Sequence, residues 1–187
     1  MMLATDEAAR RGLTTMGWTR AHSGAAPAIA NMSAQVHQGY PEGQESFANR
    51  LSLWPQGCFL YHSGHGEDLL GYMICHPWML DQCVPLDHVI DRLPADPTCL
   101  YLHDLALLPA TRGSGAGRAG VQLANSLAQA AGLPVIGLVA LPDAIGFWRH
   151  AGFQDSSARP HSSYGTGAIV MQRAVQSESE IVQPALP

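Results

Sequence analysis

The stretch His103–Gly120, HDLALLPATRGSGAGRAG, constrains the fold of this chain more than any other segment. An apolar, alternating segment leads through Pro109 into a turn in which three glycines lie between Arg112 and Arg118, and a helix-like sequence follows. Glycine loses more conformational freedom on folding than any other residue, so three in one short turn need a reason. The pattern predicts a strand, a tight glycine-rich turn and a helix.

A turn of this kind is suited to binding an anion. The first N–H groups of a helix have no partner within the helix, and the helix dipole places partial positive charge there. Glycines let the backbone approach a phosphate closely, and Arg112 and Arg118 can add charge-assisted hydrogen bonds. The turn therefore predicts a phosphate site, with a purely structural strand-to-helix connection as the alternative.

Length and composition place this turn in a single globular domain. The chain has 187 residues, of which 47% are hydrophobic and 13% charged, which suits one domain with a full core rather than a disordered chain. A formal net charge of −5 gives no general attraction to nucleic acid or to an anionic membrane, so any anion site is local. The four cysteines show no CxxC pairing or zinc spacing, and the first twenty residues contain no long apolar run. We therefore expect a cytoplasmic protein without a membrane partner.

Hydrophobic spacing and Gly/Pro punctuation predict an alternation of strands and helices. The expected elements are a first strand in 14–21, helices in 26–40 and 46–57, a hairpin of 58–62 with 69–76, a strand at 99–108, a helix at 118–131, a buried strand at 134–141, a short helix in 142–152 and a last strand at 167–175. Residues 1–175 then form one domain, with a loose lead over 1–12, a long Pro/Asp-rich excursion over 77–98 and a disordered tail over 176–187.

Two known phosphate-binding patterns fit the turn poorly. A P-loop requires Lys and Ser/Thr after its last glycine, whereas Arg118 and Ala119 follow Gly117. The dinucleotide pattern GxGxxG is matched from Gly115 to Gly120, but Pro109–Ser114 separate it from the strand, and too little chain follows for a doubly wound sheet. An NAD(P)-binding oxidoreductase is thus a remote alternative.

A third pattern fits better. The segment LALLPATRGSGAGRAGVQLA, with Arg112, Gly115 and Gly117 at R-x-x-G-x-G spacing, resembles the coenzyme A signature of the GCN5-related N-acetyltransferase (GNAT) family. Downstream, AIGFWRHAGF (Ala144–Phe153) is similar to the second motif of that family. The resemblance implies an α/β (α+β) fold, a mixed, mostly antiparallel sheet flanked by helices. It also implies acetyl-CoA as co-substrate, attacked directly by an amine with no metal.

The same resemblance implies which residues bind the co-substrate. Main-chain groups of the strand would contact the pantetheine arm, one of its N–H groups would polarise the thioester carbonyl, and the glycine turn would wrap the pyrophosphate. The cofactor-binding residues expected in this way are Leu105, Ala106, Leu107, Arg112, Gly113, Ser114, Gly115, Ala116, Gly117 and Arg118.

The proton of the attacking ammonium needs a base, and His103 is the first candidate. Imidazole titrates near neutrality, and LHDLAL is similar to the arylalkylamine N-acetyltransferases, which have histidine at the His103 position; the alternative is a structural histidine. Strand alternation places His103 and Leu105 on one face, and Asp104, the rival base or a contact for the substrate's cation, on the other. His62 and His65 lie at HxxH spacing, but without a third ligand they predict no metal site.

This sequence departs from the family in its second motif. The tyrosine proposed there as the acid for the leaving thiolate is replaced by Trp148, whose indole N–H cannot do that work. Tyr164 is a candidate substitute, with a packing tyrosine as the alternative. The replacement also keeps open a degenerate acyl-CoA-binding sensor or scaffold without turnover. The acceptor is expected to be a small-molecule amine or a protein or peptide amine, and similar proteins are frequently homodimers.

Overall fold

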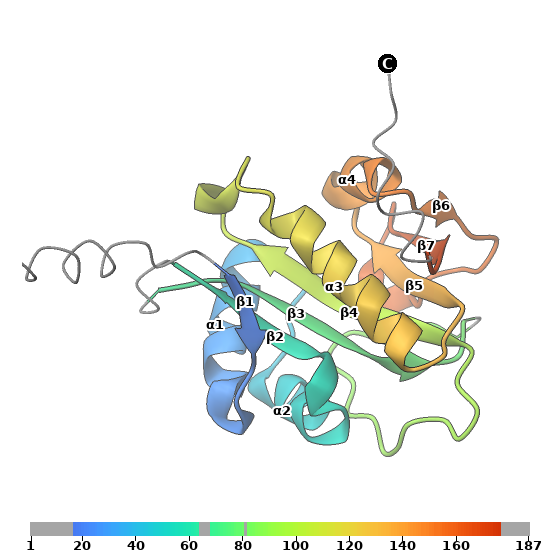
Figure 1. The fold of residues 1–187 in the computed structure, drawn as a ribbon, viewed down its shortest axis with the longest axis horizontal. Helices are drawn as coiled ribbons and strands as arrows, with labels where there is room; N and C mark the ends of the chain where they lie inside the picture. Colours follow the sequence, from blue (N-terminus) through green and yellow to red (C-terminus); the bar gives the residue numbers. More distant parts are fainter. Residues whose placement is uncertain (1–16, 64–67, 81, 177–187) are drawn as a thin grey trace, which may run out of the picture.

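The computed structural model describes residues 17–63, 68–80 and 82–176, and its centre is a seven-stranded sheet in the order β1-β2-β3-β4-β5-β7-β6 (Figure 1). The strands are β1 Gly17–Arg20, β2 Cys58–His62, β3 Leu69–Trp78, β4 Cys99–Leu107, β5 Val135–Ala140, β6 Gln154–Asp155 and β7 Ile169–Ala174. The helices are α1 Ala26–Val36, α2 Gln44–Leu53, α3 Ala116–Ala130 and α4 Ile145–His150. All neighbouring strands pair antiparallel except β4 and β5, which run parallel.

The expected α/β fold with a mixed, mostly antiparallel sheet flanked by helices is therefore confirmed. The sequence did not predict β6, a strand of two residues. The predicted excursion begins later than expected, because Pro77 and Trp78 pair with β4 as the end of β3. The expected lead over 1–12 lies outside the described residues. So does the predicted tail except for Gln176, whose carbonyl accepts hydrogen bonds from Asn125 and Gln129 of α3.

Helices cover both faces of the sheet, and each face has its own apolar core. On one face α1 and α2 bury Ile29 and Phe47 against Tyr72 and Ile74 of β3. On the other face α3 and α4 pack on the sheet. The buried residues of this second core include Met73, Leu100, Leu102, Val121, Ala124, Ile136, Leu138 and Trp148. Fully burying such side chains contributes about 1.5–3 kcal/mol each, so both helical layers are held mainly by apolar burial.

A β-bulge in β4 changes which residues share a face. In the pairing of β3 with β4, Ile74 lies opposite Asp104 but Cys75 lies opposite Leu102, so His103 is an extra residue in its strand. His103 contacts Glu42 and Asp104 contacts His37, and both partners belong to the α1–α2 connection. The expectation that alternation puts His103 and Asp104 on opposite faces is therefore wrong, because the bulge turns both toward α1 and α2.

The two parallel central strands separate soon after they meet. β4 and β5 pair only at Leu100↔Ile136 and Tyr101↔Gly137, and both strands continue beyond these pairs. The following residues of the two strands, Leu102–Leu107 and Leu138–Val139, line one cavity of about 860 Å³. The divergence thus opens a space in the middle of the sheet, where the strand edges have no neighbouring strand from the described part of the chain.

Candidate active site

The glycine turn connects β4 to α3 at one end of this opening. Gly113 and Gly115 have φ of 77° and 81°, in the left-handed region, and open space lies where a Cβ of either would stand. Gly115 is the residue before the first turn of α3. Glycine takes this conformation without strain, which explains two of the three glycines on conformational grounds. Conformation alone does not explain why the space beside Gly113 and Gly115 is open.

The backbone N–H groups of the turn divide into two sets. Within the part of the chain that the structure describes, the N–H of Ser114 donates to the Thr111 carbonyl and that of Ala116 to the Ser114 hydroxyl. No described group accepts from the N–H of the remaining four, which are Gly113, Gly115, Gly117 and Arg118. Four orphan donors at the N-terminus of a 15-residue helix form a surface of the kind that favours an anion.

The surroundings of the turn keep this surface rigid and positive. Arg112 and Arg118 are exposed, and neither makes a hydrogen bond or ion pair with any described residue. The Trp18 indole N–H donates to the Ala116 carbonyl at 3.1 Å, which ties β1 to the first turn of α3. The Phe147 ring of α4 lies 3.1 Å from the position of a Cβ on Gly117, so the turn adjoins the cavity through this ring.

The edge of β4 that faces the opening carries free main-chain groups. The N–H of Leu108 donates to the Leu70 carbonyl, toward β3. Hydrogen-bonding direction alternates along a strand, so Ala106 also points to β3, whereas the N–H and C=O of Leu105 and Leu107 point into the gap left by β5. Of the three residues expected to contact pantetheine by main chain, two have the required direction.

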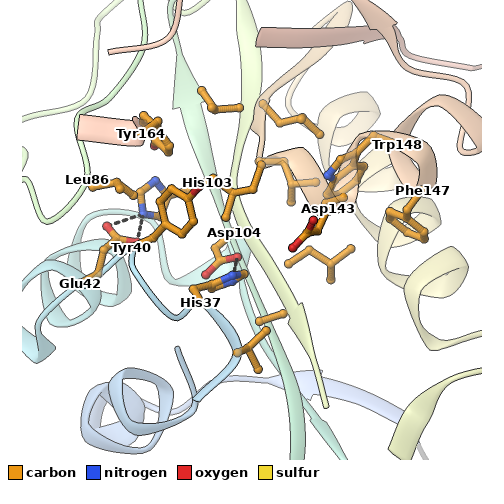
Figure 2. A pocket seen from close by; sticks show the side chains of 18 of the residues that line it. His37, Tyr40, Glu42, Leu86, His103, Asp104, Asp143, Phe147, Trp148 and Tyr164 are labelled. Atoms are coloured by element: carbon orange, nitrogen blue, oxygen red, sulfur yellow. Dashed lines mark hydrogen bonds and ion pairs between the residues drawn. The ribbon is translucent and has the colours of Figure 1, made fainter. Parts of the chain in front are cut away.

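His103 forms a buried pair with Glu42, a residue of the α1–α2 connection (Figure 2). The Nε2 atom lies 3.0 Å from one carboxylate oxygen, and the side chains are 1% and 5% exposed. Burial raises the pKa of Glu42, but His103 and the N–H of Asp87 outweigh burial and hold that pKa below its usual value. A carboxylate needs a donor, so a neutral His103 carries its proton on Nε2. Its Nδ1 is buried with no partner among the described residues.

Asp104 lies in a separate, saturated cluster. His37 Nε2 is 3.0 Å from one of its oxygens, and the Tyr72 hydroxyl donates to the other. Burial raises the pKa of Asp104, but these two partners outweigh burial and hold it below the usual range. For His37, burial lowers the pKa, and the charge of Asp104 more than compensates and raises it. The arrangement pairs a histidine whose protonated form is favoured with a carboxylate that does not readily take a proton.

Tyr164 and Trp148 border the cavity on opposite sides (Figure 2). The Tyr164 hydroxyl donates to the Val84 carbonyl at 3.0 Å, and burial raises its pKa, so the phenol is protonated at neutral pH. Trp148 is buried against Phe147 and Phe153 in edge-to-face contacts. Trp148 therefore acts as a wall of the cavity, while Tyr164 carries a proton.

The sequence reasoning missed Glu42, His37 and Tyr72. His37 and Glu42 stand in a short connection, HQGYPEG, whose Gly and Pro predict only a turn. They lie 67 and 61 positions from their partners in β4. A turn rich in titratable residues was the one signal available, and no spacing rule links it to a strand so distant in the sequence.

Three further findings concern metal binding, the HxxH pair and membrane crossing. Across the described residues no group of three or more His, Cys, Asp and Glu is placed to hold a metal ion. Of the HxxH pair, His62 ends β2 and His65 lies outside the described residues. None of the helices in the described part of the chain is both long and apolar enough to cross a bilayer.

Comparison with known proteins agrees with this geometry. The model of the acetyltransferase (GNAT) family matches residues 26–153, which span α1 through α4 and include both sequence motifs. No curated protein sequence matches the chain.

Solved structures share the fold at low sequence identity. Ard1 from Thermoplasma volcanium is 16% identical with a TM-score of 0.67, over 87% of this chain and 99% of that one. The loading GNATL domain of CurA from Lyngbya majuscula is 13% identical with a TM-score of 0.68, over 86% and 98%. N-acetylglutamate synthase from Neisseria gonorrhoeae, solved with coenzyme A and N-acetyl-glutamate, is 18% identical with a TM-score of 0.64, over 87% of this chain and 36% of that one. Because the family model matches more than half of this chain, the chain belongs to the acetyltransferase (GNAT) family.

Proposed function

We propose that this protein transfers the acetyl group of acetyl-CoA to a primary amine by direct attack. The observation that carries the proposal is the set of four amides, Gly113, Gly115, Gly117 and Arg118, that have no acceptor among the described residues. They lie beside two arginines that make no hydrogen bond or ion pair with any described residue. A diphosphate presents several acceptor oxygens and negative charge, and it matches this set in both number and sign. Ser114 and Ala116 contribute to the shape of the turn rather than through their own amides.

The pantetheine arm runs from the turn into the opening between β4 and β5. There the arm takes the place of the missing strand. It hydrogen-bonds to the outward N–H and C=O groups of Leu105 and Leu107, as an added strand would. Ala106 contributes the cavity wall rather than a hydrogen bond. One of the outward N–H groups donates to the thioester oxygen and stabilises the charge that develops on it during attack.

The proton is removed by His103. Glu42 accepts a hydrogen bond from the Nε2–H of His103. This leaves the lone pair of the buried Nδ1 to take the proton of the amine through a water that reaches it. The amine nitrogen then forms a bond to the acetyl carbon, the electron pair returns from the oxygen, and the C–S bond breaks to release the thiolate. Glu42 is a positioning residue, because it acts through the imidazole.

Asp104 has a different role in this proposal from that of a base. Both of its oxygens are engaged and its pKa is lowered, so it orients His37 and the α1–α2 connection at the mouth of the cavity. Tyr164 is the residue we assign to proton delivery to the leaving thiolate. Its hydroxyl must exchange its bond to Val84 to do so, and a thiol of ordinary pKa, about 8.5, leaves with little help.

Mass spectrometry of an amine library incubated with the protein and acetyl-CoA tests this proposal. An acetylated product that forms only when the protein is present excludes the alternative of an acyl-CoA-binding sensor or scaffold without turnover. Calorimetry separates the remaining cases. Binding of acetyl-CoA at tens of micromolar supports the assignment, whereas retention of NAD(P) with no affinity for coenzyme A favours the dinucleotide-binding alternative.

A further inference from the structure

The charges that line the cavity are unbalanced. Among the described residues that line it, three carry carboxylates, namely Glu42, Asp104 and Asp143. The only basic side chains in this described lining are two histidines, with no arginine or lysine. Each histidine is already paired with a carboxylate, His103 with Glu42 and His37 with Asp104. Even with both histidines protonated, the lining keeps an excess of negative charge.

Asp143 is the carboxylate without a counter-charge. It follows β5, it is exposed, and it makes no hydrogen bond or ion pair with any described residue. Figure 2 shows its side chain between the cluster of His37 and Asp104 and the aromatic wall of Trp148. A cation that enters the cavity therefore meets a free carboxylate, whereas an anion meets no arginine or lysine among the described lining residues.

Arg50 is the guanidinium that comes closest to supplying such a donor, and its position excludes it. It is 1% exposed, it does not line the cavity, and one of its nitrogens is held by the His88 carbonyl and by Asn49. Its Nε and second terminal nitrogen lack partners among the described residues. They lie inside the protein, where α2 packs on the segment around His88, and Arg50 is not among the residues that line the cavity, although its charge acts on Glu42 and Tyr164.

The end of the cavity away from the aromatic wall surrounds His103. Tyr40 and Leu86 lie there beside Glu42 and Tyr164 (Figure 2), so this end combines apolar surface with the buried His103–Glu42 pair. Leu86 is fixed there because its N–H donates to the Ser163 hydroxyl and the next residue, Asp87, donates to Glu42. The whole volume of about 860 Å³ is in the range of small-molecule sites and is shared with the pantetheine arm.

We propose that the acceptor is a small primary amine with an uncharged, apolar body and no carboxylate, so that free α-amino acids are excluded. This rests on the proposed function and names the substrate class of the same site. An alkylammonium is attracted by the negative lining, and its apolar body can pack against Tyr40 and Leu86. The carboxylate of an amino acid would lose its hydration beside Asp104 and Asp143 without gaining an arginine or lysine as counter-charge among the described lining residues.

Three probes of one shape test this inference, namely 2-phenylethylamine, phenylalanine amide and phenylalanine. They share the ring and the amine and differ at the α-carbon, where only phenylalanine carries a negative charge. We expect kcat/KM with acetyl-CoA to be at least about 100-fold higher for the first two than for phenylalanine. A rate for phenylalanine within threefold of the amine overturns the inference.

A variant removes the free carboxylate. Asp143→Asn should lower kcat/KM for 2-phenylethylamine several-fold and should reduce the ratio of kcat/KM for 2-phenylethylamine to that for phenylalanine. The control is Asp96→Asn, at an exposed aspartate that does not line the cavity. It should change neither value. An unchanged preference in Asp143→Asn contradicts the role of this residue.

Binding separates failure of this inference from failure of the proposed function. If no probe is acetylated, calorimetry of the three probes with the protein still ranks them, and equal or stronger binding of phenylalanine, or no binding of the amine at millimolar concentration, overturns the inference. Absence of acetyl-CoA binding instead overturns the proposed function.

Discussion

The two ends of the active-site opening are built in different ways. The turn that we assign to the diphosphate is made of consecutive residues, Arg112–Arg118, and its shape follows from two left-handed glycines and the start of α3. The acceptor end is assembled from the α1–α2 connection, β4 and the segment around Leu86, through contacts such as Leu86 to Ser163 and Tyr164 to Val84 that span 77 and 80 positions. Local backbone chemistry therefore fixes one end, and tertiary packing fixes the other.

The largest expected effect comes from the local end. Gly115→Glu places a carboxylate and a Cβ in the open space where we place the diphosphate, so acetyl-CoA affinity should fall at least about 100-fold by calorimetry. Gly132→Glu is a matched control. Gly132 also has positive φ, 67°, and open space around its Cβ position, but it lies at the other end of α3. Similar losses in both variants would show that backbone strain, not phosphate contact, causes the effect.

The next effect comes from the assembled end and should leave the local end intact. His103→Ala should lower kcat about 100-fold or more, the usual range for losing a general base, with acetyl-CoA affinity unchanged. His150→Ala, at an exposed histidine of α4, serves as control. If the rate and its pH profile survive in His103→Ala, His103 is not the base.

A smaller loss is expected for Glu42→Gln, about tenfold in kcat. The amide oxygen can still accept a hydrogen bond from the Nε2–H of His103, but it carries no charge to stabilise a positive imidazole. The informative measurement is the double variant. Because Glu42 acts through His103, Glu42→Gln should add nothing in the His103→Ala background. Independent, additive losses would assign Glu42 a role of its own.

The smallest effect is one on stability. Asp104 has a lowered pKa, so its contribution is present above its unfolded pKa of about 3.9 and is lost as pH falls through the folded value. His37 has a raised pKa, so its contribution is present below about 6.5 and is lost as pH rises through the folded value. The ion pair thus stabilises most between about pH 4 and 6.5.

Replacing the histidine of this pair tests that window. His37→Gln should reduce the free energy of unfolding by about 1 kcal/mol at pH 6, measured by urea denaturation, and the difference from wild type should shrink above pH 8. His150→Gln should leave the curve unchanged at both values. A deficit that is constant with pH would mean that His37 contributes by packing alone.

The same contrast explains what the sequence could reveal. The glycine turn, the helix after it and the succession of strands and helices along the chain were predictable, because their signals are periodic or contiguous. The facing of His103 was not, because a single extra residue in β4 reverses alternation. The partners Glu42, His37 and Tyr72 were hidden for a related reason. Their role arises only where α1, α2 and β3 meet β4, and no local pattern encodes that meeting.

Amide hydrogen exchange of the turn, followed by NMR with and without coenzyme A, tests the central claim most directly. The account predicts that coenzyme A slows exchange most at Gly113, Gly115, Gly117 and Arg118, whose N–H groups no described residue accepts. Ser114 and Ala116, already bonded within the turn, should change less. Binding of coenzyme A that leaves exchange at those four amides unaltered would contradict it.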